Sequence, residues 1–377
     1  MKTVLMRYVK VLALLVSIVL TVLFLQNTLF YYFDGNYYRL RGFYREPENS
    51  LDVVLLGASD ISNGFSPGYA YDYSGLTSYL YSTSGNRGSQ YLSQVKEVLA
   101  KQRPQMLIFE VHGFLTETIE EYYKEVRLRY YVENIPMSMN KLATIIEHDY
   151  DDRLSFIVPF FKYHSQWTED FDELRNRFII GSSSDSAPSP LKGYGTSSII
   201  SSIMPYYDVA ENDETIALLP DAEQHLIELL EYLQTCGVEN ILFTRLPHQL
   251  LTEMALNRFL RSNRVEEIVT SYGFDFLDLE QNAVEMDINY EYDFSDADHL
   301  NFAGQMKLTE YLCDLMLDEY GVEPMPQTDE NQQQWEKAVA YTYALQEYSD
   351  ELGENGEMMY LSETPELLRE LELRLNQ

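Results

Sequence analysis

The chain contains few cysteines and few basic residues. Only Cys236 and Cys313 are cysteines among its 377 residues. No disulfide framework is therefore expected, and the fold must rest on its hydrophobic core. Lysine and arginine number 27 against 60 aspartates and glutamates, which gives a net charge of -33. A surface this acidic repels nucleic acid and anionic lipid, so we expect neither as a binding partner.

The longest uncharged segment lies near the N-terminus. Residues 11–33 contain no charged side chain, and a helix of that length would extend about 34 Å, enough to span a bilayer. Lys2, Arg7 and Lys10 precede the segment and Asp34 follows it. By the positive-inside rule we expect residues 1–10 in the cytoplasm, residues 11–33 as a single-pass anchor in the cell membrane, and the remainder extracytoplasmic. The alternative is a cleaved signal peptide, but residues 26–31 offer no pattern of small residues for cleavage.

Short apolar segments alternate with amphipathic ones from residue 51 onward. We expect strands at 51–56, 106–111, 240–244 and 274–279, and helices at 89–102, 221–236, 262–272 and 302–320. This alternation predicts an α/β fold, a three-layer sandwich with a mostly parallel sheet covered on both faces. Three further segments complete the expected organisation: an extracytoplasmic domain over 34–325, an insertion within it at about 115–220, and an acidic C-terminal tail at 326–377.

A serine follows the first expected strand. In Leu56-Gly57-Ala58-Ser59-Asp60, Gly57 permits a tight turn that can expose the Ser59 hydroxyl. Ligands of open α/β sheets bind where the strands end, so this serine is well placed to act as a nucleophile. The alternative is a serine that only shapes the turn.

A second polar motif precedes the last expected helix. Asp296 and His299 lie three residues apart, close enough for the carboxylate to orient the imidazole as a general base. The alternatives are a polar loop in which Asp296 or Asp298 caps the helix, and a metal site made by Asp296, Asp298 and His299. That site lacks a second cluster of ligands, so we expect neither a metal nor a cofactor.

Together these motifs carry a resemblance. Gly57-Ala58-Ser59-Asp60, with Asp296-x-x-His299-Leu300-Asn301-x-x-Gly304 near the end of the domain, resembles the SGNH (GDSL-like) hydrolases. Their sheet is flavodoxin-like. More narrowly, the chain is similar to membrane-anchored members related to the teichoic acid D-alanyl transfer protein and to alginate-type O-acetylation proteins. The motifs Tyr163-His164-Ser165-Gln166-Trp167 and Lys192-Gly193-Tyr194 also look like features of this group. The resemblance implies a catalytic triad of Ser59, Asp296 and His299.

The same resemblance implies an oxyanion hole built from a glycine N–H and an asparagine side chain. Gly85 in Ser84-Gly85-Asn86 matches the glycine. The family's later Gly-x-Asn-Asp block is absent, and Glu110-Val111-His112-Gly113 stands in its place. Asn86 or His112 could supply the missing donor, although Asn86 could equally be a turn residue and His112 a packed or surface histidine. His112, His164 and Trp167 are also candidate substrate contacts.

Two functions from different classes remain. The first is a serine esterase or O-acyltransferase that adds or removes acetyl or D-alanyl groups on a cell-envelope polysaccharide or teichoic-acid-like polymer. The resemblance implies a membrane-bound O-acyltransferase as a partner that supplies acyl groups. The second is a non-catalytic envelope scaffold on the same fold, which the absent asparagine block favours. The presence of Ser59, Asp296 and His299 together favours the enzyme, because a scaffold has no need of all three.

Overall fold

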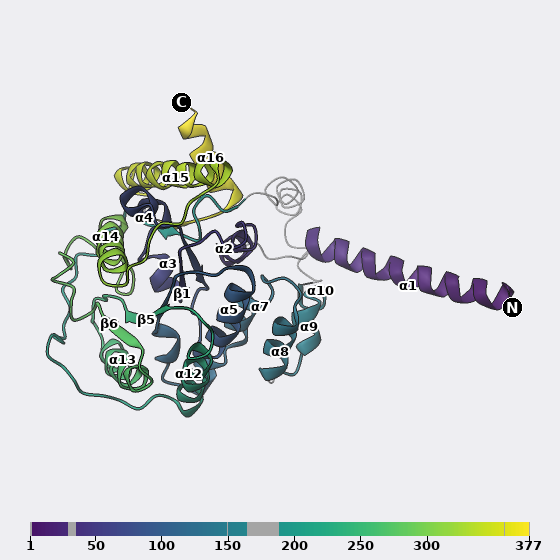
Figure 1. Cartoon of the computed structure of the whole chain (residues 1–377), viewed down its shortest axis with the longest axis horizontal. Coiled ribbons are helices and arrows are strands. Elements are labelled where there is room, and N and C mark those ends of the chain that lie inside the picture. The colour runs from purple at the N-terminus through teal and green to yellow at the C-terminus, as the bar shows by residue number, and fades with distance from the viewer. Residues whose placement is uncertain (1, 29–34, 149, 164–187, 358, 377) are drawn as a thin grey trace. The chain divides into compact units, whose positions relative to one another are not determined.

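The structure is a computed structural model that describes residues 2–28, 35–148, 150–163, 188–357 and 359–376 (Figure 1). The chain divides into two compact units, residues 1–33 with 145–187 and residues 34–144 with 188–377. The first unit contains the long helix α1 (Lys2–Thr28), α9 (Arg153–Ile157) and α10 (Phe160–Tyr163). The second contains the sheet, and α8 (Met139–Glu147) crosses the boundary between the two.

Helix α1 is long and apolar enough to cross a membrane. Its segment Val4–Leu25 has a mean hydropathy of 2.6, and none of it is buried inside the structure. This segment overlaps the expected span of 11–33 and also includes Arg7 and Lys10. A membrane anchor and a signal sequence share these properties, and the orientation of the helix stays a prediction.

The second unit is built on the predicted α/β architecture. Five strands form one parallel sheet in the order β2-β1-β3-β5-β6. They are β1 (Val53–Gly57), β2 (Ser78–Ser82), β3 (Met106–Glu110), β5 (Asn240–Arg245) and β6 (Asp275–Asp278). The three inner strands are rich in Val, Leu, Ile and Phe and are almost entirely buried, as expected for a parallel sheet covered on both faces.

Helices cover both faces of this sheet (Figure 1). On one side lie α3 (Ser59–Ser62), α4 (Pro67–Ser74) and α14 (Phe302–Asp318). On the other lie α5 (Gly88–Lys101), α12 (Pro220–Leu233) and α13 (Glu253–Ser271). The main core includes Leu308 and Leu312 of α14 and Val53 and Leu55 of β1 in one buried apolar cluster. Helices on both faces of a buried sheet make a three-layer sandwich.

Short elements connect these layers. They are α2 (Gly35–Phe43), the 3-10 helix η1 (His112–Phe114), α6 (Ile119–Tyr122), α7 (Glu125–Val132) and the strand pair β4 (Gly195–Thr196) and β7 (Leu361–Ser362). The edge strand β2 is protected from pairing with another chain, because Leu80 donates its N–H to the carbonyl of Lys192, 3.1 Å away. Lys192 and the next residue, Gly193, both adopt a positive φ at this contact.

The segment expected as a C-terminal tail packs onto the second unit. It forms α15 (Asp329–Glu354) and α16 (Pro365–Leu375), and α15 lies along α4 (Figure 1). Trp335 of α15 is fully buried and stacks on Tyr71 of α4 with ring centroids 5.1 Å apart. Residues 326–377 are therefore part of the folded unit that carries the candidate site.

Candidate active site

Ser59 begins α3 directly after β1, at the carboxyl edge of the sheet. The chain turns sharply here because Gly57 lies against β3, where a Cβ would meet the Cβ of Glu110 at 2.8 Å. Glu110 holds this turn by accepting the Ala58 N–H at 3.0 Å and the His112 N–H. The strand end thus presents a half-buried Ser59 hydroxyl at the point where parallel α/β sheets bind ligands.

Asp296 and His299 lie in a tight loop before α14. Phe294 and Leu300 form an antiparallel bridge that closes the loop. Inside it, the Ser295 N–H donates to the carbonyl of His299 at 2.9 Å. The Asn301 side chain caps α14 by accepting the Gly304 N–H at 3.2 Å, which fixes where the loop ends. This short loop turns the Asp296 carboxylate back toward the His299 ring.

The structure brings Ser59, His299 and Asp296 together in a row. Oγ of Ser59 lies 3.0 Å from Nε2 of His299, and both carboxylate oxygens of Asp296 lie 2.9 Å from Nδ1 of the same ring. A proton on Nδ1 would be donated to Asp296, which leaves Nε2 free to accept the serine proton. The three residues predicted as a triad therefore have the geometry that nucleophilic catalysis requires.

Acidic neighbours set the charge of this histidine. Burial alone would lower the pKa of His299, but the hydrogen bond with Asp296 and the negative charge of Asp60 outweigh it and raise the pKa above its ordinary value. Burial would raise the pKa of Asp296, yet the same hydrogen bond holds it below its ordinary value. Carboxylates facing His299 thus favour the imidazolium that would form when the ring takes the serine proton.

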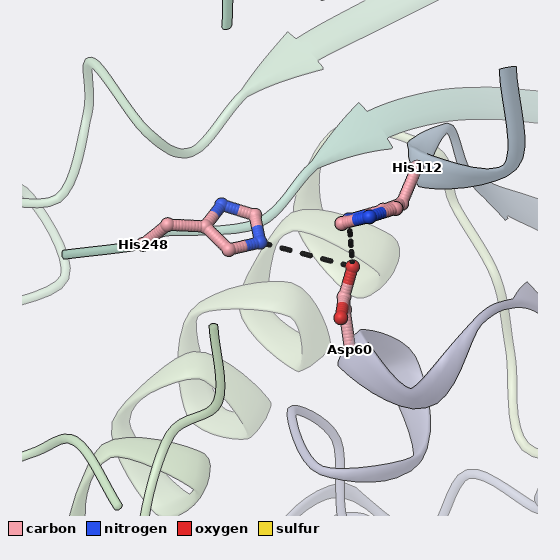
Figure 2. Close-up of side chains that lie close together, drawn as sticks. All are labelled: Asp60, His112 and His248. Carbon is pink, nitrogen blue, oxygen red and sulfur yellow. Dashed lines mark ion pairs between the residues drawn. The ribbon is translucent and has the colours of Figure 1, made fainter. Parts of the chain in front are cut away.

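A second cluster of polar side chains lies beside the nucleophile (Figure 2). Asp60, the residue after Ser59, is almost fully buried. Its Oδ2 lies 2.7 Å from Nδ1 of His112 and 3.7 Å from Nε2 of His248, and its Oδ1 lies 3.7 Å from Nε2 of His299. Nδ1 of His248 lies 2.9 Å from Glu280. We call Asp60, His112, His248 and Glu280 the histidine–carboxylate cluster.

Charges in this region depart from their ordinary values. Burial would raise the pKa of Asp60, but His112 and His248 hold it well below its usual range. Burial would lower the pKa of His248, but its contacts with Asp60 and Glu280 raise it well above its usual range. Burial, with the nearby charge of Asp60, raises the pKa of Glu110 to about 7. Perturbed groups of this kind gather at functional sites more often than elsewhere.

A cavity of about 410 Å³ opens over Ser59, a size typical of ligand sites. Ser59, His299 and Asp60 line it together with Gly85 and Arg127. The cavity is also lined by residues just before and just after residue 115, where the expected insertion begins. They are His112, Thr116, Glu117, Thr118 and Glu121. His112, expected as a substrate contact, thus lies at this cavity as well as in the buried cluster.

Gly85 lies at the cavity, but the Asn86 side chain does not. Gly85 has a φ of +61°, which suits glycine. Asn86 is fully buried, and its amide donates to Gln94 at 2.9 Å and accepts from the same residue at 3.1 Å. The expected role of Asn86 as the oxyanion donor therefore needs correction, because its amide is held in the interior by Gln94.

An arginine that the sequence did not indicate lies against Gly85. A Cβ at Gly85 would fall 2.7 Å from Cζ and Nε of Arg127. Nη1 of Arg127 donates to the carbonyl of Ser84 at 3.3 Å. In the described part of the chain, the buried Nε has no hydrogen-bond partner. Two other arginines line the cavity: Arg87 pairs with Glu121, and Arg258 lies 3.9 Å from Asp298. Arg127 is the one of the three that lies against Gly85.

Two of the predicted substrate contacts, His164 and Trp167, lie outside the residues that the structure describes. Asp60, His248 and Arg127 were not among the predicted site residues. A signal existed for the first two, because Asp60 follows the nucleophile and His248 follows the end of β5, at the same edge of the sheet. Arg127 reaches the site from α7, and nothing in its local sequence indicates that approach.

Comparison with known proteins identifies no family. No family model matches the chain, and no curated protein matches it. Among solved structures it is similar to one described as a gut microbial diltiazem-metabolizing enzyme, with 9% sequence identity and a TM-score of 0.35. That similarity covers 73% of this chain, which spans 48% of the other. A similarity of this size assigns neither a family nor an activity.

Proposed function

We propose that the chain is a membrane-anchored serine enzyme of the SGNH type that transfers or hydrolyses acyl esters. The observation that carries the proposal is the row of Ser59, His299 and Asp296, with contacts of 3.0 and 2.9 Å, at the mouth of a cavity large enough for a ligand. A structural polar loop has no need to align these three groups at the end of a central strand.

The reaction begins when Ser59 Oγ attacks the carbonyl carbon of the acyl ester. His299 Nε2 accepts the hydroxyl proton, and Asp296 stabilises the resulting imidazolium. His299 then returns the proton to the departing alkoxide, which leaves an acyl group on Ser59. A second hydroxyl, either from a sugar or from water, takes the acyl group by the reverse sequence of proton transfers.

The negative oxygen of the tetrahedral intermediate needs donors at the cavity. Gly85 can offer its backbone N–H, and Arg127 lies against Gly85 with an unused buried Nε. Arg127 therefore takes the place of the asparagine that the family pattern supplies and the sequence lacks. A guanidinium in a partly buried site is a stronger donor than a neutral amide, because its hydrogen bonds are charge-assisted.

The cellular setting comes from the N-terminus and from the resemblance. A retained α1, with Lys2, Arg7 and Lys10 on the cytoplasmic side, would hold the catalytic unit outside the membrane. A cell-envelope polysaccharide or teichoic-acid-like polymer would then be the acceptor or substrate. A membrane-bound O-acyltransferase would supply the acyl group if the reaction is transfer.

The test is covalent labelling of the full-length, detergent-solubilised protein with a fluorophosphonate probe. Wild type should label, and Ser59→Ala should not. Ser62→Ala is the matched control, because this serine lies on the same short helix and its buried hydroxyl donates to the backbone carbonyl of Ser59 at 3.0 Å. Equal labelling of wild type and Ser59→Ala would refute the proposal, as would the absence of labelling in folded wild type.

A second measurement separates transfer from hydrolysis. Wild type is given p-nitrophenyl acetate with and without a soluble sugar acceptor, and the products are separated by mass. Acetylated sugar that depends on Ser59 identifies a transferase, whereas acetate alone identifies an esterase.

A further inference from the structure

The histidine–carboxylate cluster has the arrangement of a metal site (Figure 2). Asp60, His112 and His248 each direct one donor atom toward the others, and these three atoms lie within 4.8 Å of one another. They come from three places in the chain, the start of α3, the start of η1 just after β3, and the loop after β5. Parallel strands bring all three to the carboxyl edge of the sheet.

Two donor atoms in the cluster have ion-pair neighbours but no hydrogen bond of normal geometry. Oδ2 of Asp60 and Nε2 of His248 are both buried, and neither has a hydrogen-bond partner within the described ranges. Nδ1 of His112 is 2.7 Å from Oδ2 of Asp60, but without the alignment that a hydrogen bond requires. A buried carboxylate oxygen left in this condition is costly unless a positive charge occupies the space beside it.

Glu280 orients His248 as a ligand. Nδ1 of His248 lies 2.9 Å from the Glu280 carboxylate, whose side chain is 3% exposed. A proton on Nδ1 is donated to that carboxylate, so the lone pair of a neutral ring lies on Nε2 and points toward Asp60. Histidines that bind metals nearly always donate their other ring N–H to a carboxylate or carbonyl in this way.

The distances also suit one ion. Donors in a tetrahedral zinc site lie about 2.0–2.2 Å from the metal and so about 3.3–3.6 Å from one another. The two separations from Asp60 Oδ2, 2.7 Å to His112 and 3.7 Å to His248, lie on either side of that range. Small rotations of the two rings would equalise them. Two imidazoles with one carboxylate favour zinc and similar transition ions over calcium or magnesium.

We propose that Asp60, His112 and His248 bind a divalent transition-metal ion of the zinc class beside the nucleophilic serine. Asp60 and His112 also line the cavity over Ser59, so the remaining coordination position faces that cavity and takes a water or a substrate oxygen. The site does not depend on the proposed esterase activity, because its donors are distinct from the Ser59–His299–Asp296 row.

Metal content tests the site directly. The full chain is purified in detergent with a tag free of histidine, stripped with a chelator, dialysed against Zn²⁺ and analysed by mass spectrometry for zinc. Wild type should retain about one zinc per chain. Asp60→Asn and His248→Gln should each bind zinc at least tenfold more weakly, and Glu280→Gln about 10- to 100-fold more weakly.

Two controls make the result specific. Ser59→Ala should keep the zinc, which separates the metal site from the failure or success of the serine mechanism. His225→Gln should keep the zinc as well. His225 lies outside the cluster, and its Nδ1 is 2.9 Å from the Tyr122 hydroxyl. Zinc retained by His248→Gln, or lost equally in His225→Gln, would overturn the proposal.

The competing explanation is that a protonated His248, without any metal, balances the negative charge of the Asp60 carboxylate. Stripped wild type that binds no zinc would support that ion pair and reject the metal site. If the Asp60 and His248 variants do not fold, Co²⁺ added to wild type decides. Visible absorption bands of a low-symmetry cobalt site, abolished by an equivalent of Zn²⁺, support the proposal, and a spectrum equal to that of free Co²⁺ rejects it.

Discussion

Ser59 Oγ and His299 Nε2 lie 3.0 Å apart, although 240 residues separate them in the chain. One follows the first strand of the sheet and the other precedes a helix that belongs to the same hydrophobic core as that strand. Because α14 and β1 share this core, the loop before α14 is held near the end of β1. The contact is therefore a product of the main hydrophobic core and not of local sequence.

Of the three residues in the row, Asp296 should contribute least to catalysis, because its side chain is 60% exposed. Water screens an exposed carboxylate, and in the metal-free protein Asp60 supplies a second negative charge near His299. We therefore expect Asp296→Ala to lower kcat/KM for p-nitrophenyl acetate about 100-fold, and His299→Ala to lower it at least about 10,000-fold. Equal losses in the two variants would show that the His299 ring depends on Asp296 alone, without a contribution from Asp60.

Arg127 is expected to act on the transition state. Arg127→Gln should lower kcat for p-nitrophenyl acetate about 100- to 1,000-fold with little change in KM, the usual cost of losing one oxyanion donor. Arg264→Gln is the control. This arginine of α13 does not line the cavity, and its guanidinium lies 2.9 Å from the carboxylate of Glu267. A rise in KM with unchanged kcat would instead make Arg127 a substrate-binding residue.

Replacing Asn86 should affect stability and leave catalysis almost unchanged, the opposite of the result expected for Arg127. Its amide is paired with Gln94 in the interior, so Asn86→Ala should cost about 1–3 kcal/mol of folding free energy by leaving Gln94 unsatisfied. The kcat of the folded protein should stay within about threefold of wild type, because no donor to the oxyanion is lost. Thermal unfolding and active-site titration measure the two effects separately. A hundredfold loss of kcat in folded protein would restore Asn86 to the oxyanion hole.

The sequence predicts the elements whose burial leaves a regular apolar pattern. Strands β1, β3 and β5 lie close to their expected positions because they are apolar almost throughout, and helix α14 does so because its apolar residues recur at helical spacing. Strand β2 gave no such pattern. Its residues Ser78-Tyr79-Leu80-Tyr81-Ser82 are all buried, but two are serines and two are tyrosines whose hydroxyls find partners only in the folded chain, as Tyr79 does with the carbonyl of Arg39.

The site shows the same division. Ser59, Asp296 and His299 occupy motifs with fixed local spacing, so they could be named from the sequence. Arg127 and the pairing of Asn86 with Gln94 depend on how α7 and α5 approach the loop after β2, and no local spacing encodes that approach. The acidic composition of residues 326–377 hid their packing, because the buried residues of α15 include small and polar ones such as Ala338, Thr342 and Ser349 beside Trp335.

Trp335 should be essential for the stability of the catalytic unit. It is fully buried, it stacks on Tyr71, and Lys192 Nζ lies 4.6 Å from its ring centre. Trp335→Ala should therefore lower the free energy of unfolding by about 3–5 kcal/mol. Gln333→Ala, on the exposed face of the same helix, should cost much less. A chain that loses Trp335 without a lower denaturation midpoint would show that residues 326–377 are dispensable for folding.

Glu363 should make stability depend on pH. Burial raises its pKa from 4.5 to about 7, although Ser189 donates to it and Lys192 and Arg45 lie near, with Glu46 as a further negative neighbour. The folded chain then holds a proton that the unfolded chain releases between pH 4.5 and 7, so the free energy of unfolding falls as pH rises through that range. Glu363→Gln removes this pH dependence, and above pH 7 it should be more stable than wild type by up to about 3 kcal/mol, with no gain near pH 4.

Chemical denaturation at a series of pH values measures the difference, with Glu372→Gln on the exposed face of α16 as the control. A difference between Glu363→Gln and wild type that stays constant from pH 4 to 8 would show that Glu363 is charged in the folded protein throughout.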